Sequence, residues 1–404
     1  MSNKKKLIPA LRFPEFKEDG EWAYRYGNKL FQPISNKNHD SDLPILAITQ
    51  DSGAIPRELI DYTVIASKNS VKNYKIVEKG DFIISLRSFQ GGIEYSSYRG
   101  ICSPAYIILR NRVELERDFY KYYFKTPLYI QELNRNLEGI RDGKMVSYSQ
   151  FSEIYLPFPP LPEQQKIADC LSSLDDLLAA HNEKLELLKG HKKGLMQNLF
   201  PQEGERVPKF RFPEFENDGE WRYLNGNELF QPISNKKHNS DLPILAITQD
   251  LGAIPRDLIE YTVIATKDSI KNYKVVEKGD FIISLRSFQG GIEYSLYHGI
   301  CSPAYIILRK RFELNDEFYK HYFKTPLYIQ CLNRNIEGIR DGKMVSYNQF
   351  SEIALPYPQI PEQQKIASCL SAVDDLIKAE TEKIEALKEH KKGLMQGLFP
   401  KMEN

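Results

Sequence analysis

The sequence has no surplus of charge and no long hydrophobic run. Its 404 residues carry 55 Lys and Arg against 54 Asp and Glu, a formal net charge of +1. A dedicated DNA-binding domain is usually more basic, so bulk charge gives nucleic-acid binding no support unless cations cluster locally or a partner supplies them. No apolar stretch approaches 18 residues, and the basic N-terminal segment is not followed by an apolar one. We therefore expect a cytoplasmic protein without a membrane span.

Metal-ligand spacings are also missing. The five cysteines include no CxxC pair, and the seven histidines form no pairs at metal-binding spacing. Such cysteines are typical of reduced thiols in an intracellular protein, and they exclude a disulfide framework. The sequence predicts neither a metal site nor a bound cofactor.

Catalytic motifs are missing as well. There is no GxGxxG loop and no GxxxxGK[ST] loop, and the single Pro-Pro pair, Pro159-Pro160, lacks the preceding Asn or Asp that an amino-methyltransferase uses to hold its target base. The adjacent carboxylates Asp175-Asp176 and Asp374-Asp375 fall in helical patterns, where solvated helix faces explain them better than a nuclease site. We expect a protein that is not itself an enzyme.

The sequence contains an internal duplication, with two near-copies of one module. Residues 11–200 align with residues 210–399 at a constant offset of 199 without a gap, and 148 of the 190 positions are identical. Two near-copies in one chain predict an internal pseudo-two-fold relation if they pack together. A partner with the same symmetry, such as duplex DNA, would suit this arrangement.

The first part of each repeat predicts a mixed globular domain, here called a head. Short apolar runs such as 44–49, 82–86 and 105–109 are bounded by Gly and Pro turn signals and indicate strands. Residues 118–134 have helical spacing interrupted by Pro127. The expected fold class is therefore α+β, with two globular α/β domains.

The second part of each repeat predicts a long helix. After the proline-rich segment 156–162, apolar residues recur every three or four positions over about 35 residues, which would make a rod of roughly 50 Å. Packing against its own head is one interpretation of this stripe. We favour pairing between the two helices as an antiparallel coiled coil, through Ile167, Leu171, Leu174, Leu178, Ile366, Leu370, Val373 and Ile377.

These motifs resemble the specificity subunit of a type I restriction–modification system. The residues that carry the resemblance are LPFPPLPEQQKIA at 156–168, its copy LPYPQIPEQQKIA at 355–367, the preceding GIRDGKMVSYSQF at 139–151, and RFPEF…W at 12–22 and 211–221. The resemblance covers essentially the whole chain. It departs from the family in one respect, because specificity subunits commonly carry two different recognition domains.

The resemblance implies two target recognition domains at 1–155 and 201–354, and two spacer helices at 156–200 and 355–404. It also implies a non-catalytic subunit that binds double-stranded DNA and holds two methyltransferase subunits and, optionally, two restriction subunits. The partner methyltransferases would modify one adenine in each half of a bipartite target.

Three loops of each head offer side chains suited to DNA. Arg can make two hydrogen bonds to guanine and Gln can make two to adenine, while further cations can hold phosphates. The loops 49–57, 85–92 and 139–148 predict the following DNA-binding residues: Gln50, Arg57, Arg87, Ser88, Gln90, Arg141 and Lys144, with their copies Gln249, Arg256, Arg286, Ser287, Gln289, Arg340 and Lys343.

The two heads are expected to read the same half-site, because the copies differ in or directly beside these loops only at Ser52/Leu251 and Ser149/Asn348. The target would then be an interrupted palindrome with an unread spacer of about 5–8 base pairs, if the heads lie roughly one DNA turn apart. Three alternatives stay open: the specificity subunit of a different multi-subunit restriction system, a tandem-repeat scaffold that binds only protein, and an enzyme.

Overall fold

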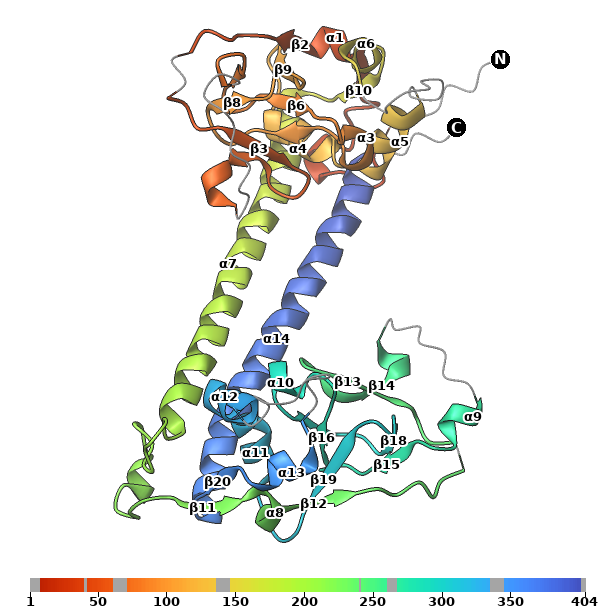
Figure 1. The fold of residues 1–404 in the computed structure, drawn as a ribbon. Coiled ribbons are helices and arrows are strands. Elements are labelled where there is room, and N and C mark those ends of the chain that lie inside the picture. Colours follow the sequence, from red (N-terminus) through yellow and green to blue (C-terminus); the bar gives the residue numbers. More distant parts are fainter. Residues whose placement is uncertain are drawn as a thin grey trace. The chain divides into compact units, whose positions relative to one another are not determined.

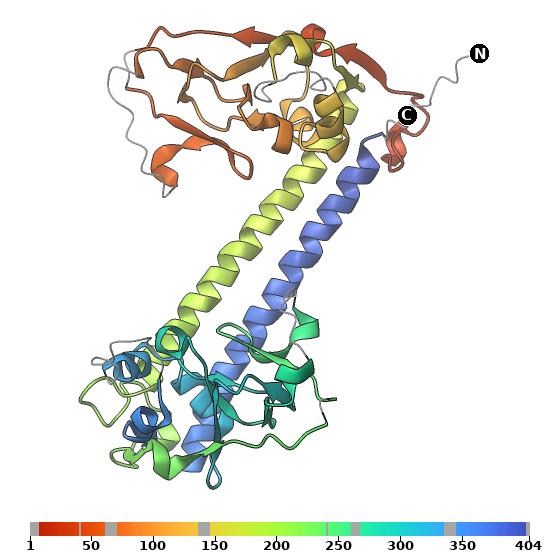
Figure 2. The same ribbon diagram turned by 45° about the vertical axis from the view of Figure 1, so that its right-hand side comes forward.

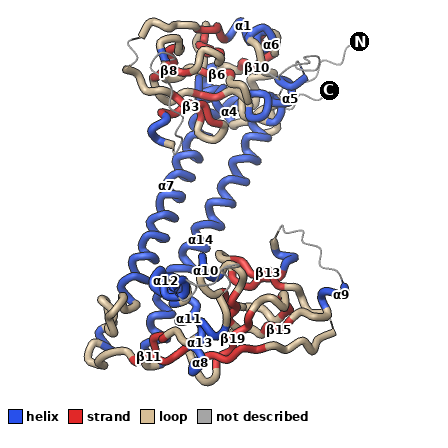
Figure 3. Tube along the Cα trace, viewed as in Figure 1, coloured by secondary structure: helices blue, strands red, loops and turns tan. Residues whose placement is uncertain are grey.

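The computed structural model describes residues 8–39, 42–60, 71–135, 146–239, 241–259, 267–334 and 345–400. The chain divides into two compact units (Figures 1 and 3). The first unit comprises Met1–Asn182 and Glu382–Asn404, and the second comprises Glu183–Thr381. Each unit therefore combines one head with part of each long helix.

The head of the first unit is built on a four-stranded antiparallel sheet in the order β2-β9-β6-β7, accompanied by the two-stranded pairs β3-β4, β5-β8 and β1-β10. The strands are β1 (Ala23–Tyr26), β2 (Phe31–Ile34), β3 (Leu46–Thr49), β4 (Gly53–Pro56), β5 (Lys75–Val77), β6 (Phe82–Ile84), β7 (Glu94–Tyr95), β8 (Gly100–Cys102), β9 (Ile107–Asn111) and β10 (Tyr155–Phe158). The helical elements are η1 (Pro14–Phe16), α1 (Gly27–Leu30), η2 (Arg57–Leu59), α3 (Ser88–Gly91), α4 (Arg117–Tyr123), α5 (Pro127–Arg135) and α6 (Tyr148–Ser152). The strands and helices predicted from the apolar runs and from Pro127 are confirmed.

Strand β6 is buried on both faces of the sheet, which explains its unbroken apolar run. Phe82 and Ile84 face an aromatic core that includes Phe31, while Ile83 faces a second cluster around Ile108. Successive strand residues point to opposite faces, so a strand between two cores must be apolar at every position. The Phe31 and Phe82 rings meet edge to face with centroids 5.5 Å apart.

The head of the second unit repeats this topology, with the sheet order β12-β19-β16-β17. Its strands are β11 (Arg222–Asn225), β12 (Phe230–Ile233), β13 (Leu245–Thr248), β14 (Gly252–Pro255), β15 (Lys274–Val276), β16 (Phe281–Ile283), β17 (Glu293–Tyr294), β18 (Gly299–Cys301), β19 (Ile306–Lys310) and β20 (Ala354–Tyr357). Its helical elements are η3 (Pro213–Phe215), α8 (Gly226–Leu229), η4 (Arg256–Leu258), α9 (Lys267–Ile270), α10 (Ser287–Gly290), α11 (Asp316–Tyr322), α12 (Pro326–Arg334) and α13 (Tyr347–Ser351).

The two long helices are α7 (Leu161–Leu199) and α14 (Ile360–Leu398), each of 39 residues. In the first unit, the beginning of α7 lies against the end of α14. Ile167 and Leu171 are buried in one core with Leu398 and Phe399, and Asp175 pairs with Lys391. Because the start of one helix meets the end of the other, the helices are antiparallel in this unit.

The second unit shows the same antiparallel pairing with the roles exchanged. Ile366 and Leu370 share a core with Leu199 and Phe200. Ion pairs join Lys192 to Asp374 at 2.6 Å and Lys184 to Glu380 at 2.8 Å. The α+β fold class with antiparallel long helices is therefore confirmed.

The residues predicted to pair the two long helices make two kinds of contact, with the head and with the other helix. The first two of each helix, Ile167 and Leu171 in α7, pack into their own head as well as against the other helix. Farther along, Leu174, Leu178 and Ile377 are half-buried and Val373 is buried. Packing on the head therefore describes the beginning of the apolar stripe, and pairing between the helices describes its whole length.

A buried ion pair joins the RFPEF motif, which precedes each head, to the PEQQ motif, which begins the long helix after it. The Arg12 guanidinium donates from Nε and Nη2 to the two carboxylate oxygens of Glu163, both at 2.8 Å. Gln164 donates to the Pro159 carbonyl oxygen at 2.7 Å and accepts from the Glu116 amide at 2.9 Å. In the second unit Arg211 and Glu362 make the same pair. The RFPEF and PEQQ motifs are therefore parts of one anchor between the head and the start of its helix.

The beginning of the described chain lies beside its end, as Figure 2 shows. The Leu11 amide donates to the carbonyl oxygen of Gly397 at 2.8 Å. In the second unit, the Phe210 amide donates to the carbonyl oxygen of Asn198 at 2.9 Å. A contact made inside a continuous segment in the second unit is thus made between the two chain ends in the first.

Candidate functional site

The loop at 49–57 is a hairpin formed by β3 and β4. Thr49 Oγ1 accepts from the Ser52 amide and donates to the Gly53 carbonyl oxygen, both at 3.1 Å, which closes the turn. Gly53 has a φ of +69°, and a Cβ there would lie 2.4 Å from the Tyr95 carbonyl oxygen. The turn is therefore held close to β7, and Gln50 is exposed on it.

The loop at 85–92 forms the short helix α3. Arg87 and Gln90 are exposed on this segment. Ser88 is only 1% exposed, and its Oγ accepts from the Ser85 amide at 2.8 Å. Ser287 is equally buried and has the same bond to Ser284. The hydroxyls of Ser88 and Ser287 therefore close their own turns and are not presented at the surface, so a contact of these two residues with DNA is not proposed further.

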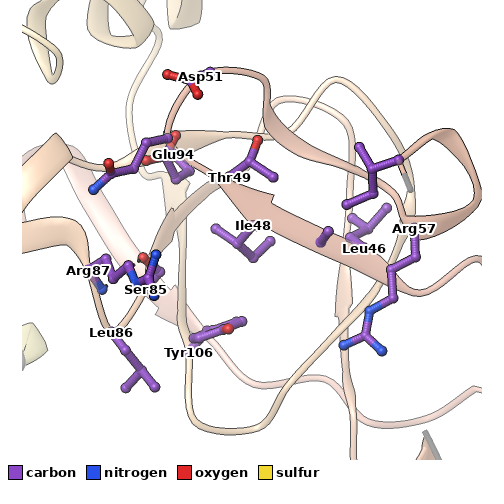
Figure 4. Close-up of a pocket in the computed structure, with 13 residues that line it drawn as sticks. Leu46, Ile48, Thr49, Asp51, Arg57, Ser85, Leu86, Arg87, Glu94 and Tyr106 are labelled. Atoms are coloured by element: carbon purple, nitrogen blue, oxygen red, sulfur yellow. Dashed lines mark hydrogen bonds between the residues drawn. The ribbon is translucent and has the colours of Figure 1, made fainter. Parts of the chain in front are cut away.

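These two loops meet at one cavity of about 520 Å³ in the first unit, here called the hairpin cavity (Figure 4). Figure 4 shows Arg87 and Arg57 on opposite sides of it, with Ile48 and Tyr106 between them. The cavity is lined by Leu46, Ala47, Ile48, Thr49, Gln50, Asp51, Arg57, Ile60, Ser85, Leu86, Arg87, Glu94 and Tyr106. Three predicted DNA-binding residues, Gln50, Arg57 and Arg87, thus share one site.

The lining of the hairpin cavity mixes donors and acceptors. Arg57 and Arg87 supply guanidinium donors, Asp51 supplies a carboxylate, and Gln50 supplies an amide that can both donate and accept. Asp51 opposes the two guanidinium groups, while Glu94 is paired with Lys125, so the lining carries only a small net charge. Such a lining is better suited to forming hydrogen bonds with base edges than to attracting phosphates.

A buried ion pair lies beneath the two loops. Lys125 Nζ donates to Glu94 Oε2 at 2.6 Å, to the Gly91 carbonyl oxygen at 3.0 Å and to the Gln50 carbonyl oxygen at 3.2 Å. Burial raises the pKa of Glu94 to about 7, and the opposing effect of Lys125 is smaller. In the second unit Lys324 binds Glu293, Gly290 and Gln249 in the same way, and burial raises the pKa of Glu293 to about 7.

The second unit carries the same set of side chains. All thirteen residues that line the hairpin cavity have identical counterparts at positions 199 residues later. The predicted Gln249, Arg286 and Gln289 are exposed and Arg256 is half-buried, as are their counterparts. The third predicted loop cannot be placed in the same way, because Arg141, Lys144, Arg340 and Lys343 lie outside the described residues.

Reasoning from the sequence missed several residues of this site. The sequence does not predict Lys125 and Glu94 as site residues, because they belong to different segments and no motif connects them. Tyr106 follows a Ser-Pro turn and belongs to an apolar run, which predicts a strand and not a site residue. One sequence signal does point to a buried ion pair: Glu94 is a charged residue between Ile93 and Tyr95, inside an otherwise apolar segment.

The described part of the chain has no group of His, Cys, Asp or Glu side chains that could hold a metal ion. None of its helices is both long and apolar enough to cross a bilayer. Both statements refer to the described segments alone.

Known proteins resemble this chain along most of its length. The sequence profile of the type I restriction modification DNA specificity domain matches residues 24–189 and 200–389. The chain is 26% identical over 310 residues to the putative type I restriction enzyme MjaX specificity subunit of Methanocaldococcus jannaschii, covering 73% of this chain and 67% of that protein. It is 24% identical over 341 residues to the MjaVIII specificity subunit of the same organism, covering 80% of this chain and 79% of the relative.

Solved structures show the same fold at low sequence identity. The S subunit of a type I restriction–modification system from M. genitalium superposes with a TM-score of 0.56 at 16% identity, covering 98% of this chain and all of that one. A chain from a study of the assembly and conformational transition of the type I system gives a TM-score of 0.55 at 17% identity, over 94% and 97%. Since the family profile covers both repeats, the chain belongs to the DNA specificity subunits of type I restriction–modification systems, in which catalysis lies in the partner subunits.

Proposed function

We propose that the chain reads a bipartite DNA target, one half-site with each head, and that the two half-sites have the same sequence. The observation that carries this proposal is the identity of all thirteen positions of the hairpin cavity between the two units. Identical side chains on an identical framework select identical bases, so the target is an interrupted palindrome.

Within each head, Gln50, Arg57, Arg87 and Gln90 are the proposed base-reading residues of the first unit, and Gln249, Arg256, Arg286 and Gln289 those of the second. Arg141, Lys144, Arg340 and Lys343 remain proposed phosphate contacts. Residues 1–155 and 201–354 act as the target recognition domains, and residues 156–200 and 355–404 as the spacer helices. We leave Ser88 and Ser287 out, because both are buried.

The proposed partners follow from the family. Two adenine methyltransferase subunits dock on the chain, and two restriction subunits join them, because the chain itself supplies specificity and no catalysis. The near-neutral net charge of +1 supports this assembly. Phosphate neutralisation usually provides much of the affinity for DNA, so partner subunits that close around the duplex would supply the missing cations.

Single-molecule methylation mapping tests the proposal. DNA from cells that express the chain together with its methyltransferase subunit is expected to carry modified adenines in an interrupted palindrome, one on each strand. An asymmetric motif would contradict equal reading by the two heads. Absence of any motif despite a purified complex would instead support a scaffold that binds only protein.

A further inference from the structure

Lys125 uses all the hydrogen-bonding capacity of its ammonium group inside the head. An ammonium has three N–H donors, and Lys125 Nζ has three acceptors within 3.2 Å: Glu94 Oε2, the Gly91 carbonyl oxygen and the Gln50 carbonyl oxygen. Its strongest partner, Glu94, is only 1% exposed. Lys125 therefore has no donor left for a phosphate, although it lines a second cavity beside Gln50 and Glu94.

The three acceptors belong to the two loops that carry the proposed base-reading residues. Gln50 lies on the turn between β3 and β4, and Gly91 ends helix α3, which begins directly after Arg87. The loops also touch directly, because a Cβ on Gly91 would lie 2.8 Å from the Gln50 side chain. One ammonium group thus joins two loops that are about forty residues apart in the chain.

The backbone next to Lys125 is fitted to the same loop. Gly92 has a φ of +80°, and a Cβ there would lie 2.0 Å from the carbonyl oxygen of Phe124. Residues 124 and 125 therefore contact the 85–92 loop through backbone and side chain together. In the second unit Gly291 and Phe323 repeat this contact, and Lys324 repeats the three hydrogen bonds.

We propose that Lys125 and Lys324 are positioning residues for sequence discrimination: each fixes the hairpin turn and the following short helix relative to one another, so that Gln and Arg meet the same half-site together. Neither lysine contacts DNA. This inference rests on the proposed DNA-reading function. Hydrogen bonds to base edges discriminate only when donors and acceptors are held close to the productive geometry, so release of one loop lowers discrimination more than it lowers affinity for any DNA.

The test uses the complete complex of this chain with its methyltransferase subunits and three duplexes: the mapped palindrome, the palindrome with one half-site substituted, and an unrelated sequence. For the unaltered complex, a substituted half-site is expected to weaken binding about ten-fold or more. With Lys125→Met, one head no longer discriminates, and the other head can occupy the intact half-site. The palindrome and the singly substituted duplex are then expected to bind within about two-fold of each other.

A double variant separates positioning from stability. Lys125→Met alone leaves the buried Glu94 carboxylate without its cation and destabilises the head, whereas Glu94→Gln with Lys125→Met removes both charges but still releases the two loop carbonyls. We expect this double variant to have a thermal midpoint near that of the unaltered chain and still to lose discrimination. Lys121→Met, which removes a neighbouring cation of α4, is expected to keep it, and Lys324→Met is expected to behave like Lys125→Met.

Two results would overturn the inference. One is a stable Glu94→Gln/Lys125→Met complex that still disfavours the singly substituted duplex about ten-fold, since the loops would then be positioned without Lys125. The other is an equal loss of affinity by the variant for all three duplexes, which would indicate a purely structural role. If the unaltered complex already fails to distinguish the duplexes, the proposed function itself is refuted.

Discussion

Arg12 and Glu163 are 151 residues apart in the chain, yet their side chains form a bidentate ion pair that is almost completely buried. Removing one partner of such a pair leaves a buried charge without compensation, which is more costly than the pair itself is favourable. The RFPEF and PEQQ motifs are therefore explained by the stability of the joint between head and helix, without any role in DNA recognition.

We expect Arg12→Met to lower the free energy of unfolding of the first unit by about 3–5 kcal/mol, because Glu163 would stay buried without a cation. Differential scanning calorimetry of the isolated chain would measure the effect. Lys166→Met is the matched control, since its pair with Glu15 is half exposed and solvent-exposed ion pairs contribute little to stability. Equal effects of the two variants would contradict a special role of the buried anchor.

The two units differ at one buried residue near the helix joint. Tyr122 donates to Asp175 at 2.7 Å in the first unit, whereas the second unit has His321 at this position, 3.3 Å from Ser371 Oγ. Burial lowers the pKa of His321 to about 4, and Lys192 adds to this effect while Asp374 opposes it. The two units should therefore respond differently to acid.

Because the folded-state pKa of His321 lies below its ordinary value of 6.5, the unfolded chain binds a proton more readily than the folded one as the pH falls. The stability that neutral His321 contributes is present above pH 6.5 and is lost as the pH falls toward 4. We expect the second unit to lose about 2 kcal/mol between pH 7 and pH 5 relative to the first. Amide hydrogen exchange in α11, compared with α4, would measure it.

His321→Tyr is the corresponding control, since it introduces the residue that the first unit already carries. With this variant, α4 and α11 are expected to show the same pH dependence of exchange. A difference between the units that persists in the variant would assign the acid response to another group.

At the scale of helices and strands, periodicity predicts the two long helices and several elements of each head, but not the order of the strands in the sheet. The apolar run 82–86 identified β6, and Pro127 correctly separated α4 from α5. The site was harder to predict. Hydrogen-bonding geometry predicts Gln50, Arg57 and Arg87 as site residues, and it predicts Ser88 equally, although Ser88 is buried. A serine hydroxyl that closes its own turn cannot be told in the sequence from one that faces solvent.

The glycines of the long helices provide a test at this scale. A Cβ at Gly194 or Gly393 would meet nothing within 4 Å, while one at Gly397 would lie 2.5 Å from a Leu11 side-chain carbon. We expect Gly194→Ala and Gly393→Ala each to raise the free energy of unfolding by about 0.5–1 kcal/mol, because alanine restricts the unfolded chain and favours the helix. Thermal denaturation would show it.

Gly397→Ala should instead lower the thermal midpoint, since the added methyl group displaces Leu11 from the end of α14. An increase in stability from this third substitution would mean that the contact between Leu11 and Gly397 adjusts freely.

For the whole molecule, the positions at which the two repeats differ test whether both heads read the same DNA sequence. The residues that line the hairpin cavity have identical counterparts in the second unit, but the tip of the turn carries an exposed Ser52 in the first unit and Leu251, 61% exposed, in the second. We expect Leu251→Ser to leave the methylated motif unchanged, because Leu251 does not correspond to a residue that lines the cavity. Methylation mapping of this variant would reveal a changed base at one half-site if the turn tip also reads sequence.

Because the two ends of the described chain lie side by side, the order of the two repeats in the polypeptide could be exchanged by circular permutation. Leu11 binds Gly397 without a covalent link, in the way that Phe210 binds Asn198 within one continuous segment. The starting point of the polypeptide is therefore interchangeable between the two repeats. A circular permutant that joins residue 400 to residue 8 through a short linker, and opens the chain between residues 200 and 209, would preserve each of these contacts. Its order of synthesis would be reversed, with the second head made before the first.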